Sequence, residues 1–459
     1  MTAVTAARKA INLLRGWPSP SLLPTPAILR AAQSALSDPA VSTPGLLYGP
    51  DAGYQPLREE ISRWLGGFYG GEPDASRICI TGGASQNLAC VLQVYSDPIA
   101  TRVWMVAPCY FLACRIFEDA GLKTRAVEEG EGGIDLVSLE QRLERSSLEG
   151  GGPEPLKRSK PWAKIYSNII YCVPTFSNPS GKTMSLATRK KLVQLARKYD
   201  ALVVTDDVYD FLQFSTDSAS ESASLTHAIL PRIVDIDRTL EPIPHQDSFG
   251  NAMSNGSFSK IAGPGVRTGW AEASPTFAYG LSQCGSSRSG GAPSQLAATL
   301  MAELLRKGEL QTHIETVLKP AYKKRYEIMV EAIMTYLVPL GVKLGEVSFE
   351  GKAVFGGYFI WLELPKGASA QLVTERAKQQ ENVIIAPGHI FEVSNDPSVQ
   401  FGDSLRVCFA WEDEEDLQES IVRLAKVIKD LRDGTSPGPD ENRLGNQGFG
   451  SKQDLGEFQ

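Results

Sequence analysis

The chain has 459 residues, of which 42% are hydrophobic and 22% are charged, proportions that fit a globular protein with a large core. Its formal net charge is −7, and its longest basic run, around Lys157 to Lys164, is short and contains proline, so we expect no nucleic-acid partner. No run approaches the roughly 20 apolar residues that a membrane span needs, so we also expect no membrane partner.

The seven cysteines form no C-x-x-C pair, and neither they nor the four scattered histidines have metal-ligand spacing, so we expect no metal site. We interpret the cysteines as reduced thiols of a cytoplasmic protein. The first residues include Arg8, Lys9 and Arg15 with no acid before Asp38, so a mitochondrial transit peptide stays open as the alternative.

Residues 1–47 are predicted to form an N-terminal arm, and residues 48–305 a large domain in which strands alternate with helices. This alternation is typical of an α/β domain with a mostly parallel sheet that is covered on both faces. Ser185 is expected to cap the helix that begins beside it. The strands expected in this domain include 77–80, 103–108, 169–174 and 201–205.

Residues 215–255 are rich in Ser, Pro and Asp without a clear period, which predicts a surface insertion. A long helical stretch near 294–337 is expected to lead into a smaller C-terminal α+β domain, which we place at 306–433. Residues 434–459 are polar and Gly-rich, which predicts a disordered tail. The smaller domain has expected strands at 356–364, 382–388 and 405–411 and a last helix at 417–431.

Chemically useful side chains follow the expected strands, and ligands of open α/β sheets bind beyond the carboxyl ends of strands. After the first strand, Gly82 and Gly83 allow a tight turn, and the next helix points free N–H groups outward, which suits a phosphate. Tyr110 follows the second strand and can stack on a planar ring. The later strand ends and the motif "SFSKIAGPGVRTG" add Asn178, Asp206, Tyr209, Ser257, Ser259, Lys260 and Arg267.

Each of these features has an ordinary explanation when it is taken alone. A Gly-Gly pair is usually a turn, a strand-end Asp is usually a helix cap, and "NPSG" is usually a β-turn. Together they describe one ligand, with a phosphate at one end, a flat ring in the middle and an aldehyde that a lysine can capture. The combination predicts pyridoxal 5′-phosphate as the cofactor.

The motifs "TGGASQ", "NPSG", "DDVY", "SFSKIAGPGVRTG" and "LRVCF", in this order, resemble those of the class I/II aminotransferases of fold type I. "LLYGPDAGYQPLREEI" and "DDVYDFL" resemble most the branch that contains the aromatic and 2-aminoadipate aminotransferases. The resemblance runs from about Ile11 to Leu431 and implies a large domain with a mostly parallel seven-stranded sheet beside a smaller α+β domain. "LLRGWPSP" departs from the "GGLPSP" that this branch often has, which places Arg15 where a glycine is usual.

The resemblance also implies a role for each matching residue. Lys260 would bind the cofactor aldehyde covalently and move the substrate's Cα proton, and Asp206 would pair with the ring nitrogen. Asn178 and Tyr209 would hydrogen-bond the phenolic oxygen of the ring, and Tyr110 would stack on its face. The phosphate would be held by Gly83, Ala84, Ser85, Ser257, Ser259 and Arg267.

Two further matches extend this site. Arg406 in "LRVCF" matches the arginine that binds the substrate's α-carboxylate, where Asn178 would assist. Tyr48 in "YGP" matches a tyrosine that reaches the cofactor phosphate of the neighbouring subunit, which implies a homodimer with shared active sites.

The predicted activity is a ping-pong transamination, in which an L-amino acid of the aromatic or 2-aminoadipate type yields its amino group to a 2-oxo acid such as 2-oxoglutarate. The same cofactor also serves β-elimination, so a carbon–sulfur lyase is the alternative. A cofactor-sensing transcription factor is a weaker alternative, because fewer than 50 residues precede Tyr48 and those factors carry a DNA-binding domain there.

Overall fold

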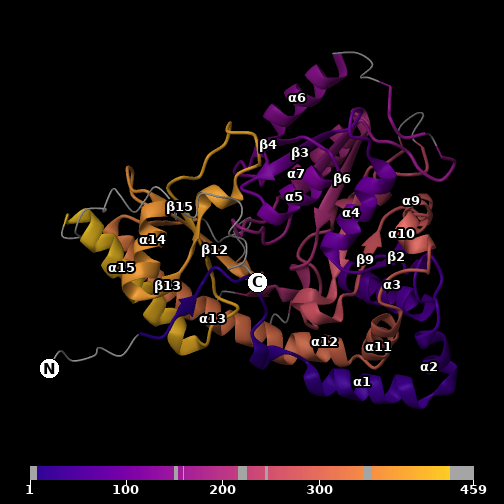
Figure 1. Ribbon diagram of the computed structural model, residues 1–459, viewed down its shortest axis with the longest axis horizontal. Helices are drawn as coiled ribbons and strands as arrows, with labels where there is room; N and C mark the ends of the chain where they lie inside the picture. Colours follow the sequence, from indigo (N-terminus) through magenta and orange to yellow (C-terminus); the bar gives the residue numbers. More distant parts are fainter. Residues whose placement is uncertain are drawn as a thin grey trace.

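The computed structural model describes residues 8–148, 154–158, 160–215, 225–242, 247–345 and 353–434, so the predicted tail lies almost wholly outside the described residues. It confirms an α/β fold built on a seven-stranded sheet with the order β2-β9-β8-β6-β5-β3-β4 (Figure 1). Within the described residues, β9 alone runs antiparallel to its neighbours in this sheet. The strands are β2 (Ile78–Thr81), β3 (Arg102–Ala107), β4 (Thr124–Glu128), β5 (Asn168–Cys172), β6 (Ala201–Asp206), β8 (Ala252–Ser257) and β9 (Gly269–Glu272).

The central strands are buried on both faces, as their continuous apolar runs predict. In β3, Val103 and Met105 pack into one core, whereas Trp104 and Val106 pack into the core on the opposite face. The first core includes α4 (Ala84–Tyr95), α5 (Phe111–Asp119) and α9 (Pro275–Ser282), and the second includes α6 (Leu136–Leu148), α7 (Leu186–Lys198) and α8 (Ile233–Thr239). Ser185 caps α7 as predicted, because its Oγ accepts a hydrogen bond from the Thr188 N–H at 3.1 Å.

The predicted surface insertion at 215–255 is wrong for much of its second half. Residues Ile233, Val234 and Ile236 of α8 are buried against the sheet, and β8 pairs with β6 and β9 near the sheet centre. The β8 sequence "AMSNGS" has polar residues where a buried strand usually has branched apolar ones. Two of them are used in hydrogen bonds, because Ser254 donates to Asp207 and Asn255 donates to Asp206 at the end of β6. Residues 216–224 and 243–246 lie outside the described part of the chain.

The C-terminal part forms a four-stranded antiparallel sheet with the order β10-β12-β15-β14. The N-terminal segment contacts both parts of the molecule, because β1 (Ile11–Asn12) pairs with β13 (Val383–Ile384) and α1 (Thr25–Ser37) packs on α11 (Gln295–Arg306) (Figure 1). The remaining elements here are β10 (Lys343–Leu344), β12 (Phe359–Glu363), β14 (Ala386–Pro387), β15 (Ser404–Cys408), α14 (Ala370–Glu381) and α15 (Glu414–Arg432).

Helices along one edge of the molecule connect the two parts. They include α12 (Glu309–His313) and α13 (Lys319–Ala332), which continue from α11 across the break at Gly308. None of the helices in the described residues combines the length and the apolar composition of a membrane span. The other elements are α2 (Pro39–Leu46), α3 (Gln55–Tyr69), α10 (Gly285–Arg288), β7 (Phe214–Ser215) and β11 (Val354–Phe355).

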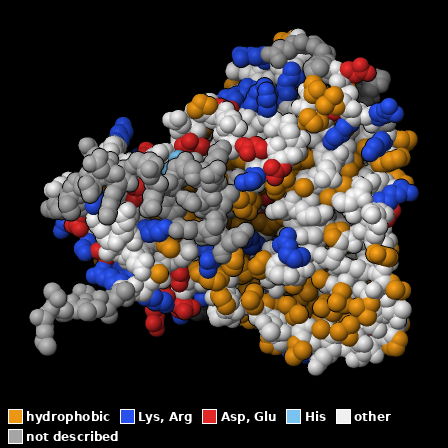
Figure 2. Space-filling view, viewed as in Figure 1, with side chains coloured by type: hydrophobic (Ala, Val, Ile, Leu, Met, Phe, Trp, Pro, Cys, Tyr) orange, Lys and Arg blue, Asp and Glu red, His pale blue; other side chains and the backbone are white. Residues whose placement is uncertain are grey.

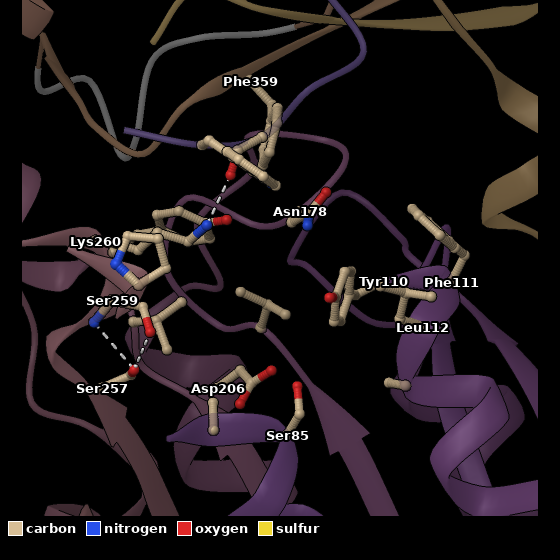
Figure 3. A pocket seen from close by; sticks show the side chains of 18 of the residues that line it. Ser85, Tyr110, Phe111, Leu112, Asn178, Asp206, Ser257, Ser259, Lys260 and Phe359 are labelled. Carbon is tan, nitrogen blue, oxygen red and sulfur yellow. Dashed lines mark hydrogen bonds between the residues drawn. The ribbon is translucent and has the colours of Figure 1, made fainter. Parts of the chain in front are cut away.

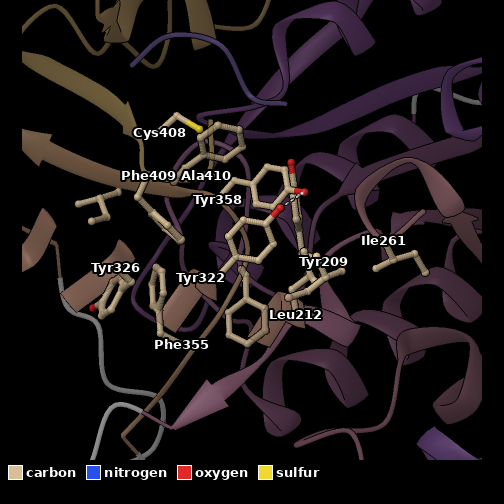
Figure 4. Close-up of a cluster of buried hydrophobic side chains, with 14 of the residues drawn as sticks. Tyr209, Leu212, Ile261, Tyr322, Tyr326, Phe355, Tyr358, Cys408, Phe409 and Ala410 are labelled. Carbon is tan, nitrogen blue, oxygen red and sulfur yellow. Dashed lines mark hydrogen bonds between the residues drawn. The ribbon is translucent and has the colours of Figure 1, made fainter. Parts of the chain in front are cut away.

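An aromatic cluster with side chains from both parts of the molecule joins them (Figure 4). Tyr322 of α13 donates a hydrogen bond to the Tyr358 hydroxyl at 3.2 Å, and Tyr358 donates to the Lys260 carbonyl at 3.0 Å. Tyr209 packs edge-on against Tyr358, with ring centroids 5.6 Å apart. The backbone of Lys260 is therefore fixed by the same cluster that holds the two parts together.

The close contact between β8 and β9 makes Gly256 a sensitive position. A Cβ atom on Gly256 would lie 2.0 Å from the Trp270 ring, so Gly256→Ala should destabilise the protein by about 3 kcal/mol and lower its melting temperature by several degrees. In α3, a Cβ on Gly67 meets nothing within 4 Å, so the control Gly67→Ala should raise stability by up to about 1 kcal/mol. Equal melting temperatures for the two variants would contradict this packing.

Candidate active site

A cavity of about 250 Å³ opens beyond the carboxyl ends of the central strands (Figure 3). The structure brings most of the predicted site residues to its wall, and Gly83 lies directly before the helix that contributes the first of them. Tyr48 does not line the cavity of its own chain and is 89% exposed. The predicted residues on the wall are Ala84, Ser85, Tyr110, Asn178, Asp206, Tyr209, Ser257, Ser259, Lys260, Arg267 and Arg406.

Lys260 ends a short helical turn, Phe258–Lys260, that follows β8 and begins at the cap residue Ser257. Its Nζ donates a hydrogen bond to the Gly16 carbonyl at 2.8 Å. Burial lowers the pKa of Lys260 to about 8, and the nearby positive charge of Arg406 acts in the same direction. A lysine with this pKa is neutral in about a tenth of the molecules at pH 7, far more than an ordinary lysine, and a nucleophilic amine must be neutral.

Asp206 ends β6 and is held by two uncharged donors. Its carboxylate accepts a hydrogen bond from the Tyr171 hydroxyl at 2.6 Å and another from the Asn255 side chain at 2.7 Å. Asn255 in turn accepts from Asn87 of α4 at 2.8 Å. Burial raises the pKa of Asp206 to about 6, although both hydrogen bonds favour the charged form. The position suits a carboxylate that pairs with a cation brought by a ligand.

Another part of the cavity wall combines a helix N-terminus, two serines and an arginine. Gly83 caps α4 with a φ of 99°, and a Cβ there would lie 3.1 Å from Arg267 Nη2, so glycine lets the guanidinium approach. Arg267 Nη2 donates to the Gly82 carbonyl at 2.9 Å. The Ser257 hydroxyl donates to Ser259 at 2.9 Å (Figure 3). Free helix N–H groups, hydroxyls and a guanidinium are the donors that bind phosphate.

Arg406 comes from β15 and crosses to the large sheet's side of the cavity. Its Nη1 donates to Asn178 Oδ1 at 3.0 Å, its Nη2 donates to the Leu14 carbonyl, and its guanidinium carbon lies 4.0 Å from the Phe359 ring centroid. Within the described residues, the buried Nε–H of Arg406 has no hydrogen-bond partner. Burial lowers the pKa of Arg406 to about 10, so the group stays charged at neutral pH and would gain from a bound anion.

Tyr110 and Tyr209, two of the predicted site residues, both line the cavity. Tyr110 caps α5 and presents its ring to the cavity beside Asn178, as Figure 3 shows. Burial raises the pKa of Tyr110 to about 12, so its hydroxyl stays protonated. Tyr209 is 3% exposed and packs against the aromatic cluster described above, and burial raises its pKa as well.

Sequence reasoning missed several residues that line the cavity or hold its side chains. Tyr171 and Asn255 donate hydrogen bonds to Asp206. The Leu14 carbonyl accepts one from Arg406, and the Gly16 carbonyl accepts one from Lys260. Tyr171 lies inside the run "IIYCVP", whose polar hydroxyl among apolar neighbours was the available signal. The carbonyl contacts carry no residue-type signal, because every residue has the same backbone group.

The donor set fits pyridoxal 5′-phosphate. A lysine amine, a buried carboxylate with two uncharged hydrogen-bond donors, and a phosphate-type cradle line one cavity, and these are the groups that the aldehyde, the ring nitrogen and the phosphate require. No three His, Cys, Asp or Glu side chains of the described ranges gather as metal ligands. All seven cysteines are free and buried.

Comparisons with known proteins agree with this geometry. The sequence profile of the family "Aminotransferase class I and II" matches residues 11–424. The aromatic-amino-acid aminotransferase 1 of Thermococcus litoralis is 28% identical over 92% of this chain and 88% of its own length. The 2-aminoadipate transaminase of Thermus thermophilus is 30% identical over 92% of this chain and 90% of its own length.

A solved structure extends the comparison to three dimensions and to the cofactor. The kynurenine aminotransferase of Pyrococcus horikoshii, solved in complex with pyridoxamine phosphate and its substrates, superposes with a TM-score of 0.74 and 28% identity. The match covers 93% of this chain and 92% of that one. These likenesses favour transamination over the carbon–sulfur lyase alternative. The chain belongs to the class I and II aminotransferases, enzymes of fold type I that depend on pyridoxal 5′-phosphate.

Proposed function

We propose that this aminotransferase takes the amino group from an aromatic or 2-aminoadipate-like L-amino acid and passes it to a 2-oxo acid such as 2-oxoglutarate, in a ping-pong cycle. The observation that carries the proposal is the convergence of Lys260, Asp206 and Arg406 on one cavity. Aromatic and aliphatic side chains on the same wall, among them Trp17, Phe111 and Phe359, would contact an apolar donor side chain.

The residues that would hold the cofactor are those already found on the wall of the cavity. When bound, pyridoxal 5′-phosphate supplies an electron sink for charge that develops at the substrate's Cα. Asp206 would hold the proton on the ring nitrogen, and the ring cation in turn would pair with a buried carboxylate whose two hydrogen-bond donors are uncharged. Asn178 and Tyr209 would orient the phenolic oxygen of the ring, and Tyr110 would stack on the ring face.

Lys260 would both anchor the cofactor aldehyde and carry a proton. Its amine can accept the proton from the substrate's Cα only while it is neutral, and the lowered pKa provides that form. The hydrogen bond to the Gly16 carbonyl uses one N–H of this amine and leaves the lone pair of the neutral form available to accept the proton. The N-terminal segment thus holds the lysine near the place where it acts.

Arg406 would bind the α-carboxylate with its planar fork and thereby orient the Cα–H bond. Asn178 Oδ1 already accepts a hydrogen bond from Arg406 at 3.0 Å, so Asn178 would hold the guanidinium in position for the α-carboxylate. The unpartnered Nε–H noted above is a donor that such a carboxylate can use.

We also propose a homodimer in which Tyr48 serves the partner's site. Figure 2 shows hydrophobic side chains gathered over the face where Figure 1 places α1 and α2. Exposed apolar patches of this kind are typical of subunit interfaces. The residues concerned are Leu29, Leu36, Leu46, Leu47, Tyr48 and Leu296, each at least 40% exposed in the single chain.

The direct test of the activity uses the purified holoenzyme and one amino acid at a time, with no oxo acid. An aromatic amino acid or 2-aminoadipate should remove the visible absorbance of the cofactor, and 2-oxoglutarate should restore it. Lys260→Ala should slow this half-reaction by at least about 10³-fold, because the proton carrier is lost. Pyruvate and ammonia released from a sulfur-containing amino acid, with the absorbance retained, would contradict transamination.

The lowered pKa of Lys260 predicts how cofactor capture depends on pH. Only the neutral amine attacks an aldehyde, and burial shifts its pKa from the usual 10.5 to about 8. The rate at which the apoprotein captures the cofactor should therefore rise with pH and reach half its maximum near pH 8. Stopped-flow absorbance measures this rate, and a curve still rising steeply at pH 10 would show that the lysine is not buried as described.

Heterodimers test the shared site. Tyr48→Phe alone should weaken cofactor binding by about 10- to 100-fold, because a hydrogen bond to a charged phosphate is lost. A heterodimer of one Tyr48→Phe subunit and one Lys260→Ala subunit has one site with both native residues only if Tyr48 crosses to the partner. That site should bind the cofactor with wild-type affinity, as in a control heterodimer of wild type with Lys260→Ala. Persistent weak binding would place Tyr48 in its own subunit's site.

A further inference from the structure

Glu129 carries a buried carboxyl group, at the carboxyl edge of the large sheet, that the proposed function does not use. It directly follows β4, and its N–H donates to the Ala107 carbonyl at the end of β3 at 2.9 Å. Its side chain is 5% exposed, and burial raises its pKa to about 7. Burying a carboxylate is unfavourable unless partners replace its lost hydration, so the partners of Glu129 indicate its role.

Both oxygens of this carboxyl group face one loop, residues 177–182, which lies between β5 and α7. The Ser180 hydroxyl donates a hydrogen bond to Oε1 at 2.7 Å, and Lys182 Nζ lies 3.6 Å from Oε2. The Lys182 side chain is 37% exposed, so water screens the ion pair in part and the hydrogen bond is the tighter contact. The same loop contains Asn178, a residue of the cavity wall.

The loop is closed by its own hydrogen bonds, so its residues are held together. The Ser177 N–H donates to the Lys182 carbonyl at 2.9 Å, and the Lys182 N–H donates to the Ser180 hydroxyl at 3.3 Å. Asn178 lies inside this closed segment, and its Oδ1 accepts a hydrogen bond from Arg406 at 3.0 Å. A shift of Ser180 therefore reaches Asn178 and, through it, the arginine assigned to the α-carboxylate.

We infer that Glu129 is a positioning residue, whose charged carboxylate holds this loop so that Asn178 meets both Arg406 and the phenolic oxygen of the cofactor. The inference rests on the proposed function, because it needs the roles that Asn178 and Arg406 have there. Lys182 is the charged group that faces Glu129 within the described residues. When Glu129 takes up a proton, the attraction to Lys182 is lost, and the hydrogen bond from Ser180 then joins two neutral groups.

The first test measures the holoenzyme without turnover and uses Glu129→Gln, which keeps the size of the side chain and loses its charge. Calorimetry with 3-phenylpropanoate, a carboxylate without an amino group, should show binding about 3- to 10-fold weaker than in the wild type. The visible absorbance of the bound cofactor should change form at a pH higher by about 0.5 to 1, because Asn178 donates less well to the phenolic oxygen. The matched control Glu128→Gln, at the exposed residue before it, should change neither value. A folded Glu129→Gln with both values of the wild type, or with weaker binding and an unchanged absorbance midpoint, would overturn the inference.

A second variant covers the case in which Glu129→Gln folds poorly. Lys182→Met removes the cation that favours the charged form of Glu129, so the pKa of Glu129 should rise above about 7. In the wild type, the affinity for 3-phenylpropanoate should fall as the pH drops through about 7, and in Lys182→Met this fall should begin at a higher pH. The same dependence of affinity on pH in both proteins would overturn the inference.

These measurements separate the inference from the function on which it rests. Binding and absorbance need no turnover, so an intact half-reaction in the wild type, with both values unchanged in Glu129→Gln, overturns the role of Glu129 alone. Changes in both values that depend on Glu129, together with no half-reaction from any amino acid, support the role of Glu129 and overturn the proposed transamination.

Discussion

Two backbone carbonyl groups, those of Leu14 and Gly16, hold the cations on which the site depends. They accept hydrogen bonds from Arg406 of the small sheet and from Lys260 of the large one. The same segment is joined to the C-terminal part by the pairing of β1 with β13 and by the Cys408 N–H, which donates to the Leu13 carbonyl at 2.8 Å. Three parts of the chain that lie far apart in sequence thus meet in one set of contacts.

This arrangement explains why the cavity favours charged ligands. Burial raises the pKa of Asp206 to about 6 and lowers those of Lys260 and Arg406 to about 8 and about 10. Each shift goes toward the neutral form, because taking a charge out of water is unfavourable without a partner of opposite sign. A ligand that brings a ring cation to Asp206 and a carboxylate to Arg406 reverses these penalties. The folded chain is therefore prepared for its ligands at some expense of its own stability.

Local motifs at strand ends were the part of the site that the sequence could predict. Asp206, Lys260 and Arg267 lie in short runs whose residue types suit the chemistry, and the fold brings the ends of parallel strands to one edge. Asn255 was missed because β8 reads as part of a polar loop, and tertiary hydrogen bonds rather than β-propensity keep it a strand. The contacts of Leu14 and Gly16 involve backbone atoms about 250 to 400 positions away from their partners, so no local pattern marks them.

The central claim is that Lys260, whose amine is hydrogen-bonded to Gly16 of the N-terminal segment, is the residue that binds the cofactor covalently. Borohydride reduction of the holoenzyme, followed by proteolysis and mass spectrometry, tests it most directly, because reduction makes the bond between lysine and cofactor permanent. The account predicts that the added cofactor mass maps to Lys260 in every loaded subunit. Mass on another lysine, or cofactor released without a covalent bond, would contradict the assignment of the site.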